Sequence, residues 1–166
     1  MMNYLARESL FRANRLFGLQ LRLINVIPLE LDGDKAAMIT GMKESIRRLK
    51  SGEMLLVFPE GTRSQDGEVH AFKPGFVILA TRSKSPILPV AIVGAFELLP
   101  RGSKKIHPGV VDVRFGEPIP VEMYERMSRE EIAEEVRKRV LAVQKELRDE
   151  RAANEINHGN ADASSR

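Results

Sequence analysis

Residues 26–58 alternate between extended and helical patterns, and this order constrains the fold more than any other feature of the chain. Val26–Leu31 is an apolar run typical of a strand, and the turn at residues 32–34 starts a helix that ends near Lys50. Met54–Phe58 predicts the next buried strand, because Pro59 ends it. A helix between two strands allows parallel pairing, so the pattern predicts an α/β fold with a mostly parallel or mixed sheet flanked by helices. The apolar face expected for the helix consists of Met38, Met42, Ile46 and Leu49.

The segment that follows the second strand places a carboxylate, a flexible backbone position and a guanidinium close together in Phe58-Pro59-Glu60-Gly61-Thr62-Arg63-Ser64. In open α/β sheets, ligands bind at the carboxyl ends of the strands, where this segment begins. Gly61 can adopt backbone angles closed to other residues, and Arg63 presents a planar fork of donors suited to phosphate oxygens. The segment therefore predicts a phosphate site. The plainer alternative is a turn with a solvated arginine.

The middle of the chain predicts one more helix and two more strands. Phe72-Lys73-Pro74-Gly75 opens a helix that closes at residues 83–86. Ile87–Val93 is a near-continuous apolar run, typical of the centre of a parallel sheet covered on both faces. Pro100–Lys105 is a basic loop, interpreted as a solvated turn rather than a phosphate clamp. Val110–Phe115 alternates as a half-buried strand does, which puts Asp112 and Arg114 on one face.

The last part of the chain predicts a capped helix followed by a tail. Ser128 and Glu131 have the spacing of a capping box. The apolar face of this helix consists of Ile132, Val136, Val140, Val143 and Leu147. Beyond residue 149 the composition turns polar, which predicts a single domain over residues 1–149 and a disordered tail over residues 150–166.

Several of these segments, taken in order, resemble the glycerolipid acyltransferase family, which contains 1-acyl-sn-glycerol-3-phosphate acyltransferase. Phe58–Ser64 resembles the family's signature block, and Ala71–Phe76 and Ile87–Val90 resemble the two blocks after it. Leu5–Phe11 and Asn25–Glu30 resemble the blocks before it. The resemblance implies a glycerol-3-phosphate acyltransferase-like fold that is incomplete at its N-terminus.

The resemblance also implies an activity in phospholipid biosynthesis. A fatty acyl group would pass from acyl-CoA or acyl carrier protein to the free hydroxyl of lysophosphatidate, giving phosphatidate, with no cofactor besides the acyl donor and no metal. The residues implied to bind the substrate phosphate are Glu60, Gly61, Thr62 and Arg63, with Arg7 and Lys73 as secondary candidates. The residues implied to line an acyl or acceptor groove are Phe58, Pro59, Leu88, Pro89 and Val90, although a plain buried strand is the alternative for the last three.

The family's catalytic motif, a histidine followed after four residues by an aspartate, is not convincingly present. In family members it precedes the segment that resembles Leu5–Phe11. His107 and Asp112 have the spacing, but a Pro-Gly turn and a strand separate them, so the fit is interpreted as accidental. His70 has Gly75 in place of the aspartate and is expected in the loop wall. No catalytic residue is therefore assigned.

Composition excludes several classes of function. The chain has 26 Lys and Arg against 23 Asp and Glu, a formal net charge of +3, which is too mild to indicate nucleic acid binding. Without cysteine there is no disulfide and no thiolate metal site. No apolar run approaches the roughly 18 to 20 residues that span a bilayer. The sequence predicts a cytoplasmic protein in peripheral contact with the inner membrane face. Leu5–Leu23, which mixes arginines with leucines, is either an interfacial segment or an amphipathic helix packed on the sheet.

Three hypotheses follow from the incomplete motif set. The favoured one is the larger part of an acyltransferase whose start lies upstream, through truncation or a misplaced initiator. The second is a short chain that binds phosphorylated glycerolipid without acylating it, and the third is a half domain completed by a partner. Translating the reading frame upstream of Met1 separates them, because a stop codon directly before Met1 contradicts the first.

Overall fold

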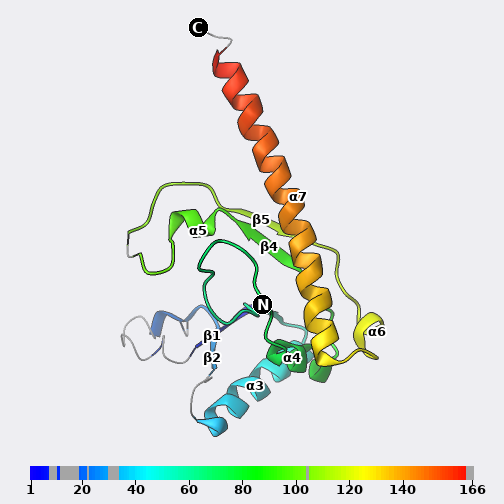
Figure 1. Ribbon diagram of the computed structural model, residues 1–166. Coiled ribbons are helices and arrows are strands. Elements are labelled where there is room, and N and C mark those ends of the chain that lie inside the picture. Colours follow the sequence, from blue (N-terminus) through cyan, green and yellow to red (C-terminus); the bar gives the residue numbers. More distant parts are fainter. Residues whose placement is uncertain (8–10, 12–18, 22, 30–33, 104, 164–166) are drawn as a thin grey trace.

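The computed structural model describes residues 1–7, 11, 19–21, 23–29, 34–103 and 105–163, without the side chains of Arg7 and residues 155–163. Its elements, shown in Figure 1, are β1 (Met2–Arg7), β2 (Val26–Leu29), α3 (Lys35–Lys50), β3 (Met54–Leu56), α4 (Gly75–Ser83), β4 (Val90–Val93), α5 (Ala95–Leu98), β5 (Asp112–Phe115), α6 (Val121–Tyr124) and α7 (Arg129–Ala163). The predicted α/β class is confirmed. No helix among the described residues is both long enough and apolar enough to cross a membrane.

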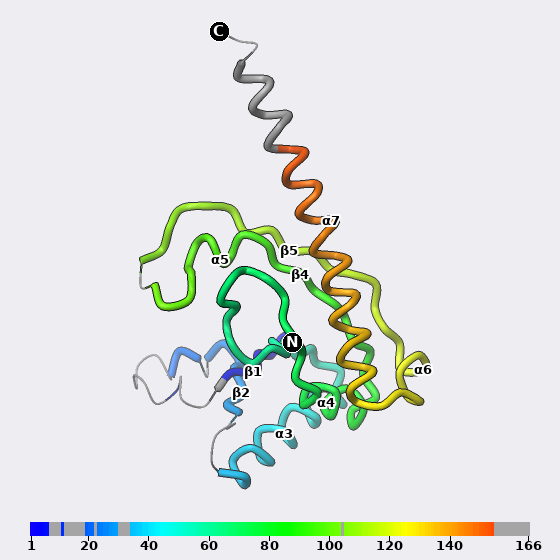
Figure 2. Tube along the Cα trace, viewed as in Figure 1, coloured from blue at the N-terminus to red at the C-terminus, as the bar shows by residue number. Residues whose placement is uncertain are grey.

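A three-stranded parallel sheet has the order β2-β1-β3. The predicted strand, helix and strand of residues 26–58 are confirmed as β2, α3 and β3, although β3 ends at Leu56. The central strand, β1, is a correction, because Leu5–Arg7 belong to it and to neither the interfacial segment nor the amphipathic helix expected over Leu5–Leu23. Much of the rest of that segment lies outside the described residues. Figure 2 shows the start of the chain in the middle of the molecule, where Met54 N donates to Met1 O at 2.9 Å.

A buried asparagine explains why β1 did not look like a strand. Asn3 is 0% exposed, and its Nδ2 donates to Glu53 Oε2 at 3.0 Å and to Met54 O at 3.1 Å. Its Oδ1 accepts from Arg48 of α3. A buried amide is stable only when its donors and acceptor are satisfied. A polar residue therefore occupies the inward position where sequence patterns lead one to expect an apolar one.

The packing face of α3 also differs from its apolar stripe. Asp34 caps the helix by accepting from Ala36 N at 2.8 Å, which agrees with the predicted start. The buried positions are Gly41 and Ser45, whereas the predicted face of Met38, Met42, Ile46 and Leu49 is only half-buried. A Cβ at Gly41 would lie 2.5 Å from Pro28 O, so close approach of β2 and not side-chain volume decides which face turns inward.

The second sheet pairs β4 with β5 antiparallel, and an isolated bridge joins Ile87 to Ile119. The prediction that Ile87–Val93 is a central strand of a parallel sheet covered on both faces is wrong. Ile92 and Leu88 are exposed, since α7 covers only the other face. The predicted shared face of Asp112 and Arg114 is confirmed: both side chains form ion pairs with α7.

The hydrophobic core lies where α4, α6 and α7 meet, and it contains Val77, Ile119, Tyr124, Ile132 and Val136. The predicted capping box begins α7, with Glu131 N donating to Ser128 Oγ at 3.2 Å and Ser128 N to Glu131 Oε2 at 2.7 Å. The predicted apolar face of α7 is confirmed, with Val143 half-buried and the others buried. Where the composition predicted a disordered tail, α7 continues to Ala163.

Candidate functional site

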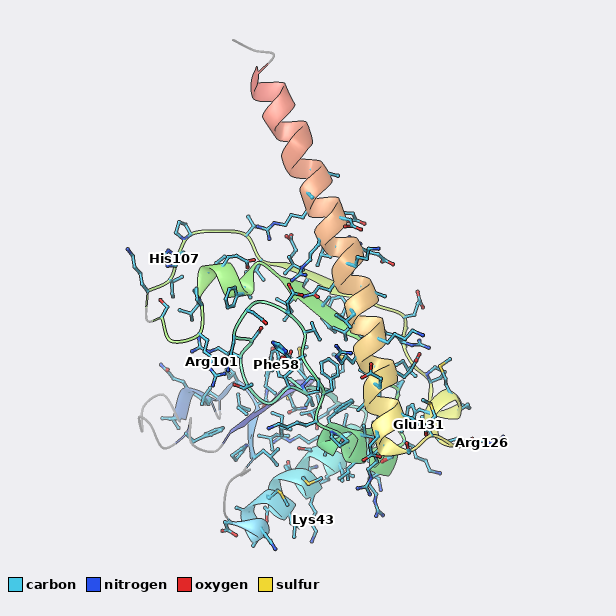
Figure 3. All side chains as sticks on the ribbon, viewed as in Figure 1. Lys43, Phe58, Arg101, His107, Arg126 and Glu131 are labelled. Atoms are coloured by element: carbon cyan, nitrogen blue, oxygen red, sulfur yellow. The ribbon has the colours of Figure 1, made fainter. Side chains whose placement is uncertain are left out.

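The candidate site is built on residues 58–73, here called the pocket loop, which connects β3 to α4. Its two ends are joined because Lys73 N donates to Pro59 O at 2.9 Å. Gly61 has φ of +70° and donates its N–H to Phe58 O at 3.0 Å, which closes a tight turn at the end of β3. Figure 3 shows Phe58 in this loop and Arg101 on the chain beside it. The loop therefore begins at a carboxyl end of the parallel sheet, as predicted.

An inner turn stiffens the pocket loop through Ser64 and Asp66. Gly67 N donates to Ser64 Oγ at 2.9 Å, and Glu68 N donates to Asp66 Oδ1 at 3.0 Å. His70 Nε2 lies 2.9 Å from Asp66 Oδ1. The backbone N–H of Glu68, followed by the His70 ring and the Ser64 hydroxyl, lowers the pKa of Asp66 from 3.8 to about 2. Asp66 is therefore ionised, and its hydrogen bonds hold the inner turn of the loop in place.

The long helix α7 holds the pocket loop from outside. Arg148 donates from Nη1 to Glu68 Oε2 and from Nη2 to Gly67 O, both at 3.1 Å. Arg137 Nε donates to His70 O at 3.1 Å. These bonds come from the polar side of a helix whose apolar side packs in the core. The loop is consequently tied to the helix that supplies Ile132, Val136 and Val140 to the hydrophobic core.

The loop and Arg101 enclose an open pocket of about 320 Å³. Its lining residues are Glu60, Thr62, Arg63, Gln65, Asp66, His70, Ala71 and Arg101. Both carboxylates accept from backbone donors, Glu60 from His70 N at 3.4 Å and Asp66 from Glu68 N. In the described part of the chain, neither pocket arginine has a hydrogen-bond or ion-pair partner. Two exposed guanidinium groups in a concave site with its carboxylates already engaged favour an anionic ligand.

The structure brings together most of the predicted phosphate-binding residues. Glu60, Thr62 and Arg63 line the pocket, and Gly61 forms the turn beneath them. Lys73 lies against that turn, because a Cβ at position 61 would be 3.3 Å from Lys73 Nζ. Arg7 ends β1, but its side chain lies outside the described part of the structure.

The predicted acyl or acceptor groove is not part of this pocket. None of its residues, Phe58, Pro59, Leu88, Pro89 and Val90, is among the lining residues. Phe58 and Leu88 are exposed and Pro89 is buried. The assignment of these residues to a groove stays a prediction.

Four residues of the pocket were not predicted from the sequence: Gln65, Asp66, Ala71 and Arg101. Arg101 belongs to the basic loop interpreted as a solvated turn, and the structure places it on the pocket wall instead. The only signal in the sequence was the concentration of basic residues in that loop. The expected position of His70 in the loop wall agrees with the structure.

The His107–Asp112 spacing does not form a catalytic pair in the structure. Asp112 Oδ2 accepts from Arg151 Nη1 at 3.4 Å, whereas His107 is exposed and donates its backbone N–H to Leu98 O at 2.8 Å. Among the described residues, no group of three His, Cys, Asp or Glu side chains is arranged to hold a metal ion.

Comparisons with known proteins agree with this geometry. A family model described as Acyltransferase matches residues 1–93. The 1-acyl-sn-glycerol-3-phosphate acyltransferase of Limnanthes douglasii is 40% identical over 85 residues, which are 51% of this chain and 30% of that protein. The protein of the same name from Bacillus subtilis is 30% identical over 117 residues, which are 70% of this chain and 54% of that protein.

A solved structure extends the match. The crystal structure of the 1-acyl-sn-glycerophosphate (LPA) acyltransferase PlsC from Thermotoga maritima has a TM-score of 0.71 and 30% identity, covering 90% of this chain and 57% of that one. The chain therefore spans between about a third and somewhat more than half of these relatives. Because the family model covers more than half of the chain and includes the pocket loop, the chain belongs to the acyltransferase family.

Proposed function

We propose that this chain takes part in the acylation of lysophosphatidate and that its pocket binds the phosphate of the acceptor. The observation that carries the proposal is the pair of pocket arginines, Arg63 and Arg101, which lack a partner among the described residues and face an open cavity. The names of the relatives support the same acceptor. The acyl donor is acyl-CoA or acyl carrier protein, and the reaction needs no other cofactor.

The reaction replaces a thioester by an oxygen ester. The free hydroxyl oxygen of lysophosphatidate attacks the thioester carbonyl carbon, the C–S bond breaks, and the thiol leaves with the proton lost by the hydroxyl. The pocket contributes by fixing the phosphate, so that the hydroxyl is held at one place relative to the donor. Two guanidinium forks can bond several phosphate oxygens at once, which fixes orientation as well as position.

The proton acceptor is a separate requirement, and general-base help typically contributes about 100- to 10,000-fold. His70 lies in the pocket wall with Nε2 against Asp66. We assign His70 a structural role, because its ring contacts Asp66 within the loop and its backbone carbonyl accepts a hydrogen bond from Arg137 of α7. A variant His70→Gln that still acylates within a few-fold of the unaltered protein supports this role. A loss of at least about 100-fold with unchanged acceptor binding makes His70 the base instead.

Acceptor binding is the direct test of the pocket. Calorimetric titration with glycerol 3-phosphate and with a short-chain, monomeric lysophosphatidate measures affinity without a membrane. Arg63→Ala is expected to weaken binding about 10- to 100-fold, because a hydrogen bond to a charged group contributes about 1.5–3 kcal/mol. Arg82→Ala removes an exposed arginine in the last turn of α4 and serves as the matched control. Equal affinities of the Arg63→Ala and Arg82→Ala variants contradict the proposed phosphate site.

The proposed acceptor and product are amphiphiles that reside in membranes. We therefore also propose that the protein is cytoplasmic and contacts the inner face of the membrane peripherally. A modest positive charge balance suits an anionic membrane surface. Cell fractionation at low and high salt tests this, since peripheral contact by charge is released by salt.

A further inference from the structure

We infer that residues 99–111, the α5–β5 loop, dock on the anionic surface of a lipid bilayer and bring the pocket to its lipid acceptor. The inference rests on the proposed function, because it specifies how a site for a phosphorylated lipid meets the membrane. Figure 1 shows this loop reaching away from the body of the molecule on the side opposite α7. Four observations about the loop carry the inference.

The first observation is charge. The α5–β5 loop carries Arg101, Lys104 and Lys105 and no Asp or Glu, since the nearest carboxylates are Glu97 and Asp112. These three cations give the loop a formal charge of +3, which equals the net charge of the whole chain. The positive and negative residues in the rest of the chain are therefore equal in number. Basic residues at an anionic bilayer surface each contribute about a 5-fold gain in binding. The loop is thus a segment whose positive charge is not offset by any carboxylate of its own.

The second observation is apolar exposure beside that charge. Ile106, next to Lys105, is 72% exposed, and Val110 and Val111 on the same loop are exposed as well. A single exposed apolar residue is ordinary, but apolar side chains mixed with lysines and without acids are typical of surfaces that enter the lipid interface. An acidic protein or a free phosphate compound would account for the lysines and not for Ile106.

The third observation is that the loop has a defined shape. His107 N donates to Leu98 O at 2.8 Å, which closes the neck of the loop. Within it, Lys105 N donates to Ser103 Oγ, and Ser103 Oγ donates to Lys105 O, both at 3.0 Å. Arg101, Lys105 and Ile106 therefore lie on a closed projection and not on an extended strand.

The fourth observation is continuity with the pocket. Arg101 belongs to the loop and also lines the pocket that contains Arg63. Contact of the projection with a bilayer would place the pocket mouth at the level of lipid headgroups, where a lysophosphatidate phosphate resides.

The absence of tryptophan from the chain allows a site-specific fluorescence test. Ile106→Trp places one indole on the loop, and Ile39→Trp places one at an isoleucine of α3 that is 47% exposed. Figure 3 shows Lys43 of the same helix far from His107 of the loop. With equimolar phosphatidylcholine–phosphatidylglycerol vesicles, the emission of Ile106→Trp should shift to shorter wavelength and that of Ile39→Trp should not. No shift for Ile106→Trp, or equal shifts for both variants, overturns the inference.

Vesicle co-sedimentation measures how much the loop contributes. Lys105→Glu is expected to weaken binding to the same vesicles about 5- to 30-fold, since it changes the charge by two units. Ile106→Ser should weaken it about 3- to 10-fold, because part of an apolar side chain leaves the interface. Lys43→Glu and Ile39→Ser on α3 are the matched controls, and circular dichroism checks that each variant is folded. Vesicle binding that neither Lys105→Glu nor Ile106→Ser weakens, relative to the α3 controls, would contradict lipid docking by this loop.

The two proposals fail in different ways. If the loop variants bind glycerol 3-phosphate normally but lose vesicle binding, both proposals stand. If the chain binds glycerol 3-phosphate through Arg63 but substitutions of Lys105 and Ile106 do not change vesicle binding, only the docking inference fails. If glycerol 3-phosphate does not bind while the loop still governs vesicle binding, the proposed phosphate site fails instead.

Discussion

The pocket loop and the core beneath α7 show opposite ways of holding a structure. Five of the core residues, Val77, Ile119, Tyr124, Ile132 and Val136, are buried and held mainly by packing. The pocket loop is largely exposed and is held by hydrogen bonds from its own turn and from two arginines of α7. Burial of apolar area is the larger source of stability, whereas polar contacts position groups without hiding them. The difference indicates that folding and ligand binding can be altered separately.

The same helix serves both regions. The apolar side of α7 packs on α4 and α6, and its polar side carries Arg137 and Arg148 to the pocket loop. A capping box and the buried face position the helix, and the helix then positions the loop. The pocket loop is therefore held in place by a helix of the core, although few of its own side chains pack in that core.

The largest effect is expected from the core. Ile132→Ala should lower the free energy of unfolding by about 2–5 kcal/mol, because it removes buried methyl groups and leaves a cavity. The affinity for glycerol 3-phosphate, measured below the melting temperature, should stay unchanged, since the pocket residues are not touched. Thermal unfolding and calorimetric titration together check this. A loss of affinity in the folded protein would show that the two regions are coupled.

A smaller effect, and one that reaches the pocket, is expected from Gly61→Ala. The variant must hold φ near +70° with a Cβ that meets Lys73 Nζ at 3.3 Å, so we expect about 1 kcal/mol of destabilisation together with weaker ligand binding. Gly52→Ala is the matched control, because Gly52 has φ of +81° and open space around it. Both variants should lose similar stability. Only Gly61→Ala should lose affinity, and equal affinities would contradict the role of this turn.

The hydrogen bonds from α7 to the pocket loop are expected to contribute still less to the stability of the protein. Arg148→Ala removes two bonds to the pocket loop in an exposed place, so the stability loss should stay within about 1 kcal/mol. Hydrogen exchange of the amides of residues 64–70 should nevertheless become faster, since the outer fastening is lost. Arg139→Ala removes another ion pair of α7, with Glu135, that does not touch the loop. The idea fails if both variants leave exchange in the loop unchanged.

The smallest effect is expected from lowering the pH, which protonates Asp66 of the pocket loop. Because the pKa of Asp66 is depressed from 3.8 to about 2, its contribution to the loop is fully present above its ordinary pKa. The contribution should fade as the pH falls through about 2, and the core should not follow, since its residues do not titrate there. NMR titration of the Asp66 carboxyl carbon measures the midpoint, with Asp66→Asn as the control for neighbouring signals. A midpoint near 3.8 would contradict the fastening role.

Much of the local structure was predictable from short stretches of sequence. The helix start at Asp34, the capping box at Ser128 and the strand before Pro59 depend on residues within a few positions of one another. Arg63 was also predictable as a pocket residue, because it follows a strand end directly. Interactions of this range are visible in a sequence because the chain itself brings the partners together.

The errors involve partners that are distant in the chain. β1 escaped notice because its inward position is Asn3, whose partners Arg48 and Glu53 are about 50 residues away. The direction of β4 was wrong because an apolar run is the same whether its neighbour is parallel or antiparallel. The apolar face predicted for α3 is not its most buried face, because the backbone of β2 approaches Gly41.

The sequence by itself determined the α/β pattern, the family and the glycine-arginine turn at the end of β3, because these depend on local order along the chain. Only the tertiary structure decided that Arg101 joins Arg63 at one pocket and that the α5–β5 loop projects beside it. The positions of residues so far apart in sequence are set by how the helices and sheets pack. That packing depends on many long-range contacts at once, and no short motif records it.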